Sequence, residues 1–473
     1  MLIPLKLIRG RPLQQQLYDQ LRTLIASGRL QAGARMPSTR MLAEQFAISR
    51  ITVILTYERL VAEGVLYTLP AAGTFVGAVQ GSGSPGPAKA PACTIIRAGA
   101  LDVGLPDPEL FPANRWRAAL RHALDRAGLR QPEDTTDRTP GLRSTIAGWL
   151  AATRGLSVAP EQIVVVSGRR RALDAIIELV GPSGRRTLTE APCDATVTRA
   201  YERVGARIIA VPVDEDGMRT ADLPAGPAAL AHVTSGHQNP LGVVLSGERR
   251  EQLAAWAEAS GAFIVEEDQD ADLRTDAALV PPMAAGAAAS RVIYMSGFAA
   301  TMAPWLQLAY LVLPPALAER AAVAHRTIDE HASWLEEAAL GEFIVSGAFA
   351  RHVHRARKVY AARRHALAEA RMLHLPEIRL VGADNGLHQA WLLPDGLGAV
   401  DRFLEVAGSR GLIAARPAPT PAAHGMQLER IVLVDVARVD EAHIDEALGV
   451  IAQAMRAVDT LADLREAREI AAD

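Results

Sequence analysis

The sequence predicts an α/β protein with a small helical module and a β-hairpin at its N-terminus. Its 473 residues are too many for one ordinary domain. After Val76 comes a stretch rich in Gly, Pro and Ser that cannot build a core, and beyond it short apolar runs alternate with helical patterns, which is typical of a mixed or parallel sheet covered by helices. We therefore expect a module over 8–77, a linker over 78–97, an α/β body over 98–460 and a helical tail over 461–473.

Composition excludes several classes of protein. Hydrophobic residues make up 49%, charged residues make up 22% and the net charge is −3, which excludes a mostly disordered chain. No apolar run has the length of a membrane span and the first residues lack the features of a signal peptide, so we expect a cytoplasmic protein. Cys93 and Cys193 are too few for a disulfide framework or a zinc site, and no metal is expected.

Charge is unevenly distributed along the chain. Residues 1–79 contain nine Lys or Arg and four acids, although the whole chain has 50 basic against 53 acidic residues. A basic module attached to an acidic body favours a polyanionic partner for the module, and chance is the alternative.

The N-terminal module has the pattern of a winged helix-turn-helix. Leucines at helical spacing indicate the first helix, and Ser38 and Ser49 are the expected N-caps of the next two. In such a module the third helix enters the major groove of DNA and the hairpin touches phosphate or the minor groove. The expected elements are helices over 12–26, 39–46 and 50–63 and β runs over 65–68 and 74–76.

Several side chains of this module suit contacts with DNA. Ser49 and Thr52 can donate to phosphate at the start of the third helix, and Arg50 can reach guanine or phosphate. Ser38 and Arg40 lie where the preceding helix would cross the DNA backbone. The alternative is that the serines are caps only and the arginines are solvated only.

The module resembles a GntR-family DNA-binding domain over its whole length. The resemblance is carried by Pro37-Ser38-x-Arg40, by Ser49-Arg50-x-Thr52-Val53 and by Gly73-Thr74-Phe75-Val76. It implies a double-stranded DNA operator as partner. The implied operator contacts are Ser38, Arg40, Ser49, Arg50 and Thr52, with Gly73 at the tip of the wing.

In the α/β body, strands and helices are expected to alternate. The expected strands cover 163–166, 186–189, 207–211, 229–234, 263–266 and 292–295, with helices over 172–179, 194–204 and 247–260. A long helical stretch over 343–370, strands near 387–392 and 431–436, and a helix over 440–457 complete the pattern.

The body resembles a fold-type I aminotransferase, a transferase that depends on pyridoxal 5′-phosphate (PLP), and with the module it resembles the MocR type of GntR regulator. The matching stretches include Val166-Ser167-Gly168, Glu190-x-Pro192, His237-Gln238-Asn239-Pro240 and Glu266-Glu267-Asp268-x-Asp270. The resemblance implies a large domain over about 112–312, a small domain over about 340–460 and a domain-swapped homodimer. It also implies that PLP serves as the effector or as the group through which an effector is bound.

The residues that PLP chemistry needs are missing at the aligned positions. The lysine that forms the Schiff base aligns with Ala300, and the arginine seven residues later aligns with Gln307. The aligned partners of the pyridinium nitrogen, of the ring hydroxyl, of the Glu-x-Pro-x-Tyr tyrosine and of the substrate carboxylate are Glu267, Gln269, Asp194 and Leu433. The chain has three lysines, Lys6, Lys89 and Lys358, and none is placed to replace the missing one. We expect no catalytic residue and no covalent PLP.

Two positions of this pocket keep alternative interpretations. Gly168 is followed by Arg169, Arg170 and Arg171 at the start of a helix, where three cations oppose the helix dipole and a bound anion would relieve that conflict. Alternatively, the arginines point to solvent or pair with acids such as Glu267 or Asp194. Asn239 either contacts a ring in the pocket or is a turn residue before Pro240.

The sequence thus predicts a DNA-binding transcription regulator whose aminotransferase-like body dimerises and senses an unknown small molecule, for which an anion is one candidate. Two alternatives stay open. One is a PLP-binding regulator or aminotransferase that uses an unrecognised site, and the other is a ligand-independent regulator in which the body is a scaffold.

Overall fold

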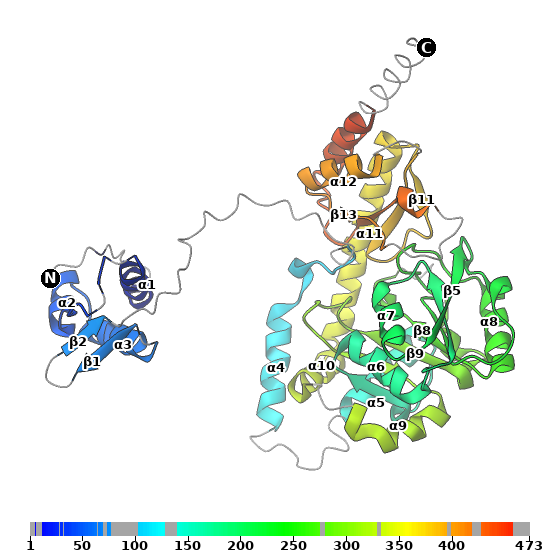
Figure 1. The fold of residues 1–473 in the computed structure, drawn as a ribbon, viewed down its shortest axis with the longest axis horizontal. Helices are drawn as coiled ribbons and strands as arrows, with labels where there is room; N and C mark the ends of the chain where they lie inside the picture. The colour runs from blue at the N-terminus through cyan, green and yellow to red at the C-terminus, as the bar shows by residue number, and fades with distance from the viewer. Residues whose placement is uncertain are drawn as a thin grey trace, which may run out of the picture. The chain divides into compact units, whose positions relative to one another are not determined.

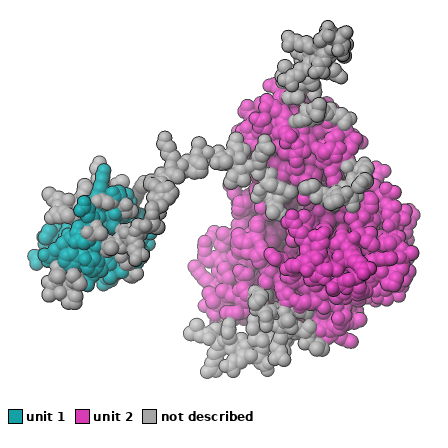
Figure 2. Space-filling view, viewed as in Figure 1, with its two compact units in different colours: residues 1–94 teal, residues 95–473 magenta. Residues whose placement is uncertain are grey.

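The structure is a computed structural model that forms two compact units, Met1–Thr94 and Ile95–Asp473 (Figure 2). The described residues are 5, 12–27, 29–31, 33–63, 65–69, 73–76, 103–127, 140–274, 280–328, 333–394, 399–418 and 427–456. The expected linker and tail, Lys6, Lys89 and Cys93 lie outside them. In the described part of the chain, no helix is long and apolar enough to cross a membrane.

Unit 1 contains the three helices and the hairpin that the sequence predicts. The elements are α1 (Leu13–Ala26), α2 (Thr39–Phe46), α3 (Arg50–Ala62), β1 (Leu66–Leu69) and β2 (Gly73–Val76). Leu17, Leu21, Leu42, Val53 and Leu60 form the centre of its core with no exposed surface. The Tyr57 hydroxyl donates to the carbonyl oxygen of Pro37 at 3.0 Å and so ties α3 to the segment before α2.

Unit 2 is built on an eight-stranded mixed sheet with the order β3-β10-β9-β8-β7-β4-β5-β6. Strands β4, β5, β7, β8 and β9 are parallel, and β10 lies antiparallel between β3 and β9. Gly297 at the end of β9 faces Ala309 at the start of β10, so the two ends of loop 298–308 meet. The bounds are β3 (Ile163–Val166), β4 (Arg186–Ala191), β5 (Arg207–Asp214), β6 (Gly217–Met218), β7 (Leu230–Val233), β8 (Phe263–Glu267), β9 (Val292–Gly297) and β10 (Ala309–Val312).

Helices cover both faces of this sheet because strand residues alternate between two apolar cores. On β9, Val292 and Tyr294 belong to one core and Ile293 and Met295 to the other. The first core contains residues of α4 (Ala113–Ala127), α5 (Pro140–Arg154), α8 (Gly247–Ser260) and α10 (Trp334–Val345). The second contains residues of α6 (Gly168–Val180), α7 (Ala195–Arg203) and α9 (Pro315–Ile328).

The prediction of one long helix over 343–370 is wrong in one respect, because the chain forms two helices there. Gly347 lies between them with a φ of 71°, a left-handed conformation that glycine adopts at little cost. α10 packs in the core of the large sheet, so this segment does not belong to the small domain that was expected from about residue 340. α11 (Ala348–His374) begins in that core and reaches the smaller sheet with its C-terminal half (Figure 1).

The smaller sheet has four antiparallel strands in the order β11-β12-β14-β13. The strands predicted near 387–392 and 431–436 are confirmed as β12 and β14. The last helix begins at 444 rather than at 440 and continues to 456, the last residue of the described range. Asp440 delays its start, because its carboxylate accepts a hydrogen bond from the backbone N–H of Ala442 in a turn. The bounds are β11 (Arg379–Val381), β12 (His388–Leu392), β13 (Ala414–Ala415), β14 (Ile431–Asp435) and α12 (Ala399–Ser409).

Candidate DNA-binding surface and effector cavity

The two serines of the DNA-binding module are helix caps. The Ser38 hydroxyl accepts a hydrogen bond from the Met41 backbone N–H at 3.2 Å at the start of α2. The Ser49 hydroxyl accepts one from the Ile51 backbone N–H at 3.3 Å at the start of α3. Both serines are exposed, so the hydroxyl hydrogens remain available to a phosphate oxygen.

Arg40 and Arg50 lie on the solvent side of the same two helices. Arg40 is exposed and pairs with Glu44, with 3.0 Å between Nε and Oε1. Arg50 is also exposed, and its Nε donates to Thr39 Oγ1 at 3.4 Å, which links the start of α3 to the start of α2. Contacts this exposed hold the side chains weakly, so both can turn toward DNA.

Thr52 and Gly73 complete the predicted DNA-binding set. Thr52 is half-buried on α3. Gly73 pairs with Leu69 directly after the hairpin tip and has a φ of 109°. A Cβ at this position would lie 3.3 Å from Arg35 Nε, so both backbone conformation and space favour glycine. The tip itself, residues 70–72, lies outside the described residues.

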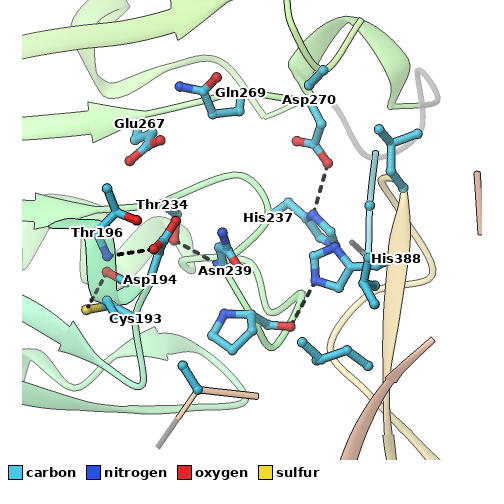
Figure 3. Close-up of a pocket in the computed structure, with 18 of the residues that line it drawn as sticks. Cys193, Asp194, Thr196, Thr234, His237, Asn239, Glu267, Gln269, Asp270 and His388 are labelled. Atoms are coloured by element: carbon cyan, nitrogen blue, oxygen red, sulfur yellow. Dashed lines mark hydrogen bonds and ion pairs between the residues drawn. The ribbon is translucent and has the colours of Figure 1, made fainter. Parts of the chain in front are cut away.

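A cavity of about 420 Å³ opens in unit 2 at the carboxyl ends of β4, β7 and β8 (Figure 3). Residues of the smaller sheet, including His388 and Leu433, close its other side. Among the predicted pocket residues, Asp194, Asn239, Glu267, Gln269 and Ala300 line the cavity, and Gly168, Arg169, Arg170 and Gln307 do not.

Arg169 binds two of the lining acids. Its Nε and Nη2 donate to the two carboxylate oxygens of Glu267, the second at 3.0 Å, and its Nη1 donates to Asp194 Oδ2 at 2.7 Å. Asp194 also caps α7, because its Oδ1 accepts from the Thr196 backbone N–H at 2.8 Å. Three N–H donors of the guanidinium are therefore used in hydrogen bonds within the protein.

A buried chain of polar groups continues from Glu267. His232 Nε2 lies 2.8 Å from Glu267 Oε2, and His232 Nδ1 lies 3.0 Å from the Tyr201 hydroxyl. Burial alone would raise the pKa of Glu267, but the charge of Arg169, aided by the hydrogen bonds from His232 and Arg169, outweighs it and holds that pKa well below its usual range. Glu267 is thus an ionised, fully paired carboxylate.

The three arginines at the start of α6 do not form an anion cradle. Arg169 pairs with Glu267 and Asp194, which is one of the two alternatives that the sequence left open. Arg171 pairs with Glu178 at 2.9 Å, and Arg170 is exposed. Of the two alternatives, the arrangement agrees with pairing to acids, because Glu267 and Asp194 occupy the donors of Arg169 that a bound anion would need.

The loop that carries Ala300 closes over the start of α6. The carboxamide oxygen of Gln307 lies 2.5 Å from where a Cβ of Gly168 would be, and Gly168 has a φ of 83°. Only glycine permits this close approach. Ala300 itself is half-buried in the cavity wall and contacts an apolar cluster that includes Leu387.

Leu433 presents a buried apolar side chain to the cavity. Arg430, its neighbour in sequence, donates from Nε to the Leu393 carbonyl oxygen at 2.9 Å and is not part of the wall. Lys358 is exposed on α11 and is not part of the wall either. Among the described residues, no lysine reaches the cavity.

Asn239 lies in the turn before Pro240, as the second interpretation of this residue expected. Its backbone N–H bonds to Thr234 Oγ1 at 3.0 Å, and the residue is exposed at the cavity (Figure 3). Its side chain therefore remains a candidate ligand contact.

Two histidines that the sequence argument did not single out form the opposite wall. His237 Nδ1 lies 3.0 Å from Asp270 Oδ2, and the rings of His237 and His388 contact each other at a tilt of 52° with 4.9 Å between their centroids (Figure 3). Burial lowers the pKa of His388, and His237 adds to this effect. The sequence signal was the His237-Gln238-Asn239-Pro240 stretch, but the partner His388 is 151 positions away and no local pattern connects them.

Glu190 is a further buried acid near the cavity. Its Oε2 accepts from the Thr234 backbone N–H at 3.1 Å and from the Thr234 hydroxyl at 2.6 Å, and Gln238 donates at 3.3 Å. Burial raises the pKa of Glu190 to about 7, because these neutral donors do not offset the loss of hydration. No cation is among the causes of this shift, in contrast to Glu267.

Together these features define a class of protein: a winged helix-turn-helix joined to an aminotransferase-like unit with a cavity at the carboxyl edge of its sheet. Residues 13–76 match the family described as "Bacterial regulatory proteins, gntR family". The chain is 34% identical over 386 residues to the probable rhizopine catabolism regulatory protein MocR of Rhizobium meliloti, covering 77% of this chain and 78% of that protein. It is 33% identical to the pyridoxine biosynthesis transcriptional regulator PdxR of Corynebacterium glutamicum, with 84% and 86% covered.

Solved structures agree on the fold of unit 2. The kynurenine aminotransferase of Pyrococcus horikoshii superposes with a TM-score of 0.64 at 24% identity, over 75% of this chain and 89% of that chain. LysN, the alpha-aminoadipate aminotransferase of Thermus thermophilus, gives 0.61 at 25% identity, over 76% and 92%. The chain belongs to the MocR-type GntR regulators, which are DNA-binding transcription regulators with an aminotransferase-like domain.

Proposed function

We propose that this regulator binds its operator through Ser38, Arg40, Ser49, Arg50 and Thr52 and responds to a small molecule in the unit 2 cavity, without covalent PLP and without transamination. The observation that carries the proposal is the contact of Arg169 with Glu267, a residue of the cavity wall. The same wall has Ala300 where the resemblance implies the Schiff-base lysine. The relatives are transcription regulators, which supports a regulatory rather than an enzymatic role.

The residues present do not fit PLP as a covalent cofactor. An alanine methyl group cannot condense with an aldehyde, so Ala300 cannot replace the lysine. Glu267, which by resemblance would face the pyridinium nitrogen, already binds the guanidinium of Arg169 through both oxygens. Gln307 packs against Gly168 without a positive charge, so the expected phosphate partner is also missing.

The DNA contacts follow from the positions of the two caps and the two arginines. Ser38 and Arg40 begin α2, and Ser49 and Arg50 begin α3, so four groups that can bind phosphate or base edges lie at two adjacent helix starts. Pairing of two chains through unit 2, as a domain-swapped homodimer, would place two such modules on two half-sites.

Removal of free PLP before chemical trapping tests the first part of the proposal. The purified chain is incubated with excess PLP, passed over a desalting column, reduced with borohydride and weighed by mass spectrometry. We expect a colourless protein of unchanged mass and an operator affinity that added PLP does not change. A stoichiometric PLP-sized adduct on any of the three lysines would overturn this part.

A cavity-filling variant tests the second part. Thermal unfolding is followed with each common amino acid, PLP and pyridoxine added singly, and any stabilising compound is tested again on Ala300→Phe, which fills the cavity. The control is Val280→Phe, at an exposed position outside the cavity wall. We expect stabilisation to survive in the control and to disappear in Ala300→Phe. The same response in both variants, or no response to any compound, would contradict an effector role for the cavity.

A further inference from the structure

α3 exposes large apolar side chains on the face turned away from the core of unit 1. Ile51 is 66% exposed and Leu55 is 44% exposed. They are four residues apart and therefore lie on the same face of the helix. Val53, Tyr57 and Leu60 pack the opposite face into the core. Since the module needs only one apolar face to fold, the second face is surplus to its stability.

Exposed cations lie near the start of α3, where Ile51 is. Arg50 directly precedes Ile51, and its bond to Thr39 places the start of α2 beside it. Arg40 lies on that helix and is exposed. An apolar strip, Ile51 and Leu55, that begins beside exposed arginines suits a polyanion that carries apolar groups between its charges better than it suits an apolar protein surface.

We propose that Ile51 and Leu55 read thymine in the operator by contacting its 5-methyl group. In the major groove each base pair shows hydrogen-bond donors and acceptors, and the thymine methyl is the apolar group among them. A branched side chain without donors cannot bind phosphate or recognise guanine, but it can exclude water from a methyl group. The proposal rests on the operator-binding role of α3 and adds the base that this helix selects.

Replacing thymine by deoxyuridine in the DNA removes the methyl group and keeps the hydrogen-bonding edge. Duplexes that bind the full-length chain are first selected from a random pool, and one operator is then made with dT and with dU. We expect the dU probe to bind more weakly by about fourfold for each methyl group contacted, which corresponds to about 0.8 kcal/mol per buried carbon.

Two variants separate a direct contact from a general effect of uracil on the duplex. The double variant Ile51→Ala with Leu55→Ala removes the apolar contact and should bring the dT and dU affinities within about twofold of each other. Val61→Ala is the matched control, an exposed branched residue at the other end of α3, and should keep the full dT preference.

Three outcomes would overturn the proposal. Equal binding of both probes by the unchanged chain excludes methyl contacts but leaves operator binding by unit 1 intact. A dT preference that persists in the double variant assigns it to other residues. A change in oligomeric state in the double variant, with the dT preference unaltered, identifies the strip as a contact between protein chains. Failure to select any duplex would instead contradict the operator-binding role itself.

Discussion

Arg169 and Glu267, which are 98 positions apart, form a two-point contact in which Nε and Nη2 of the guanidinium face the two carboxylate oxygens. In this arrangement the protein supplies from its own chain the positive charge that Glu267 requires. The charge of Glu267 is therefore compensated without any ligand, and Glu267 does not require a cation from a molecule bound in the cavity.

Removal of the Arg169 charge should destabilise unit 2. We expect Arg169→Met to lower the free energy of unfolding by about 3 kcal/mol, because Glu267 would stay buried with only His232 beside it. Because the pKa of Glu267 is depressed in the folded chain, this difference is full above its unfolded pKa of 4.5 and shrinks as the pH falls below that value.

Urea unfolding at pH 7 and at pH 3 measures this effect. The control is Arg170→Met, at an exposed position, whose free energy of unfolding should stay within about 0.5 kcal/mol of that of the unchanged chain. Glu267→Gln added to Arg169→Met should recover part of the loss. Equal stability of the two single variants at pH 7 would contradict the assigned contact.

Loss of either arginine that we propose to contact DNA should weaken specific operator binding. We expect Arg40→Ala and Arg50→Ala each to remove about 1–3 kcal/mol of binding free energy, because a phosphate or base contact is lost and no buried contact of unit 1 is disturbed. Gel-shift titration of a selected operator measures the affinity, and light scattering checks that the oligomeric state is unchanged. Arg170→Ala, an exposed arginine of unit 2, is the control, and unchanged affinity in both module variants would remove the assignment.

Glu190 should make the stability of unit 2 fall as pH rises through the neutral range. Its pKa is about 7 in the folded chain against 4.5 in the reference state, so the folded state binds the extra proton between these values. Stability is therefore highest below about pH 4.5 for this group and decreases up to about pH 7, by on the order of 3 kcal/mol. The Glu190→Gln variant should lose this slope in unfolding experiments between pH 4.5 and 7.5. A slope equal to that of the unchanged chain would show that another group titrates.

A lysine at position 300 alone should not produce transamination. We expect Ala300→Lys to show no turnover with amino acids and PLP, because Arg169 still binds Glu267 and because Gln307 and Leu433 stand where the resemblance implies arginines. A coupled assay for the keto acid product measures the rate against the unchanged chain. Measurable turnover by this single variant would mean that the pocket has kept more of the ancestral geometry than its contacts indicate.

The sequence predicted most helices and parallel strands because their signals are local. Ser38 and Ser49 mark helix starts by chemistry that acts within three residues, and both caps are present. β10 was missed because four apolar residues after a loop do not distinguish a strand from a helical start. The break at Gly347 was missed because a glycine inside a helical pattern is often tolerated.

Part of the membership of the candidate site was predictable, but its contacts were not. Alignment with a known family placed Asp194, Glu267 and Ala300 in one pocket, and all three line it. The direction of Arg169 depends on where Glu267 and Asp194 lie in space, which no spacing in the sequence reveals. The pairing of His237 with Asp270 and His388 has the same origin, because β12 brings His388 from a different sheet.

Because of the register of β9 and β10, the loop between these strands can differ in sequence without a change in the sheet of unit 2. Gly297 and Ala309 face each other in the sheet, and the Phe298 backbone N–H donates to the Leu308 carbonyl oxygen at 2.9 Å, so residues 298–308 leave and re-enter at one point. The sheet fixes both ends of this loop, so its sequence can change while the strands on both sides keep their partners. A substitution at Ala300 can therefore change the chemistry of the cavity wall without a change in the strands, and the same loop is a place where new recognition could be grafted onto the regulator.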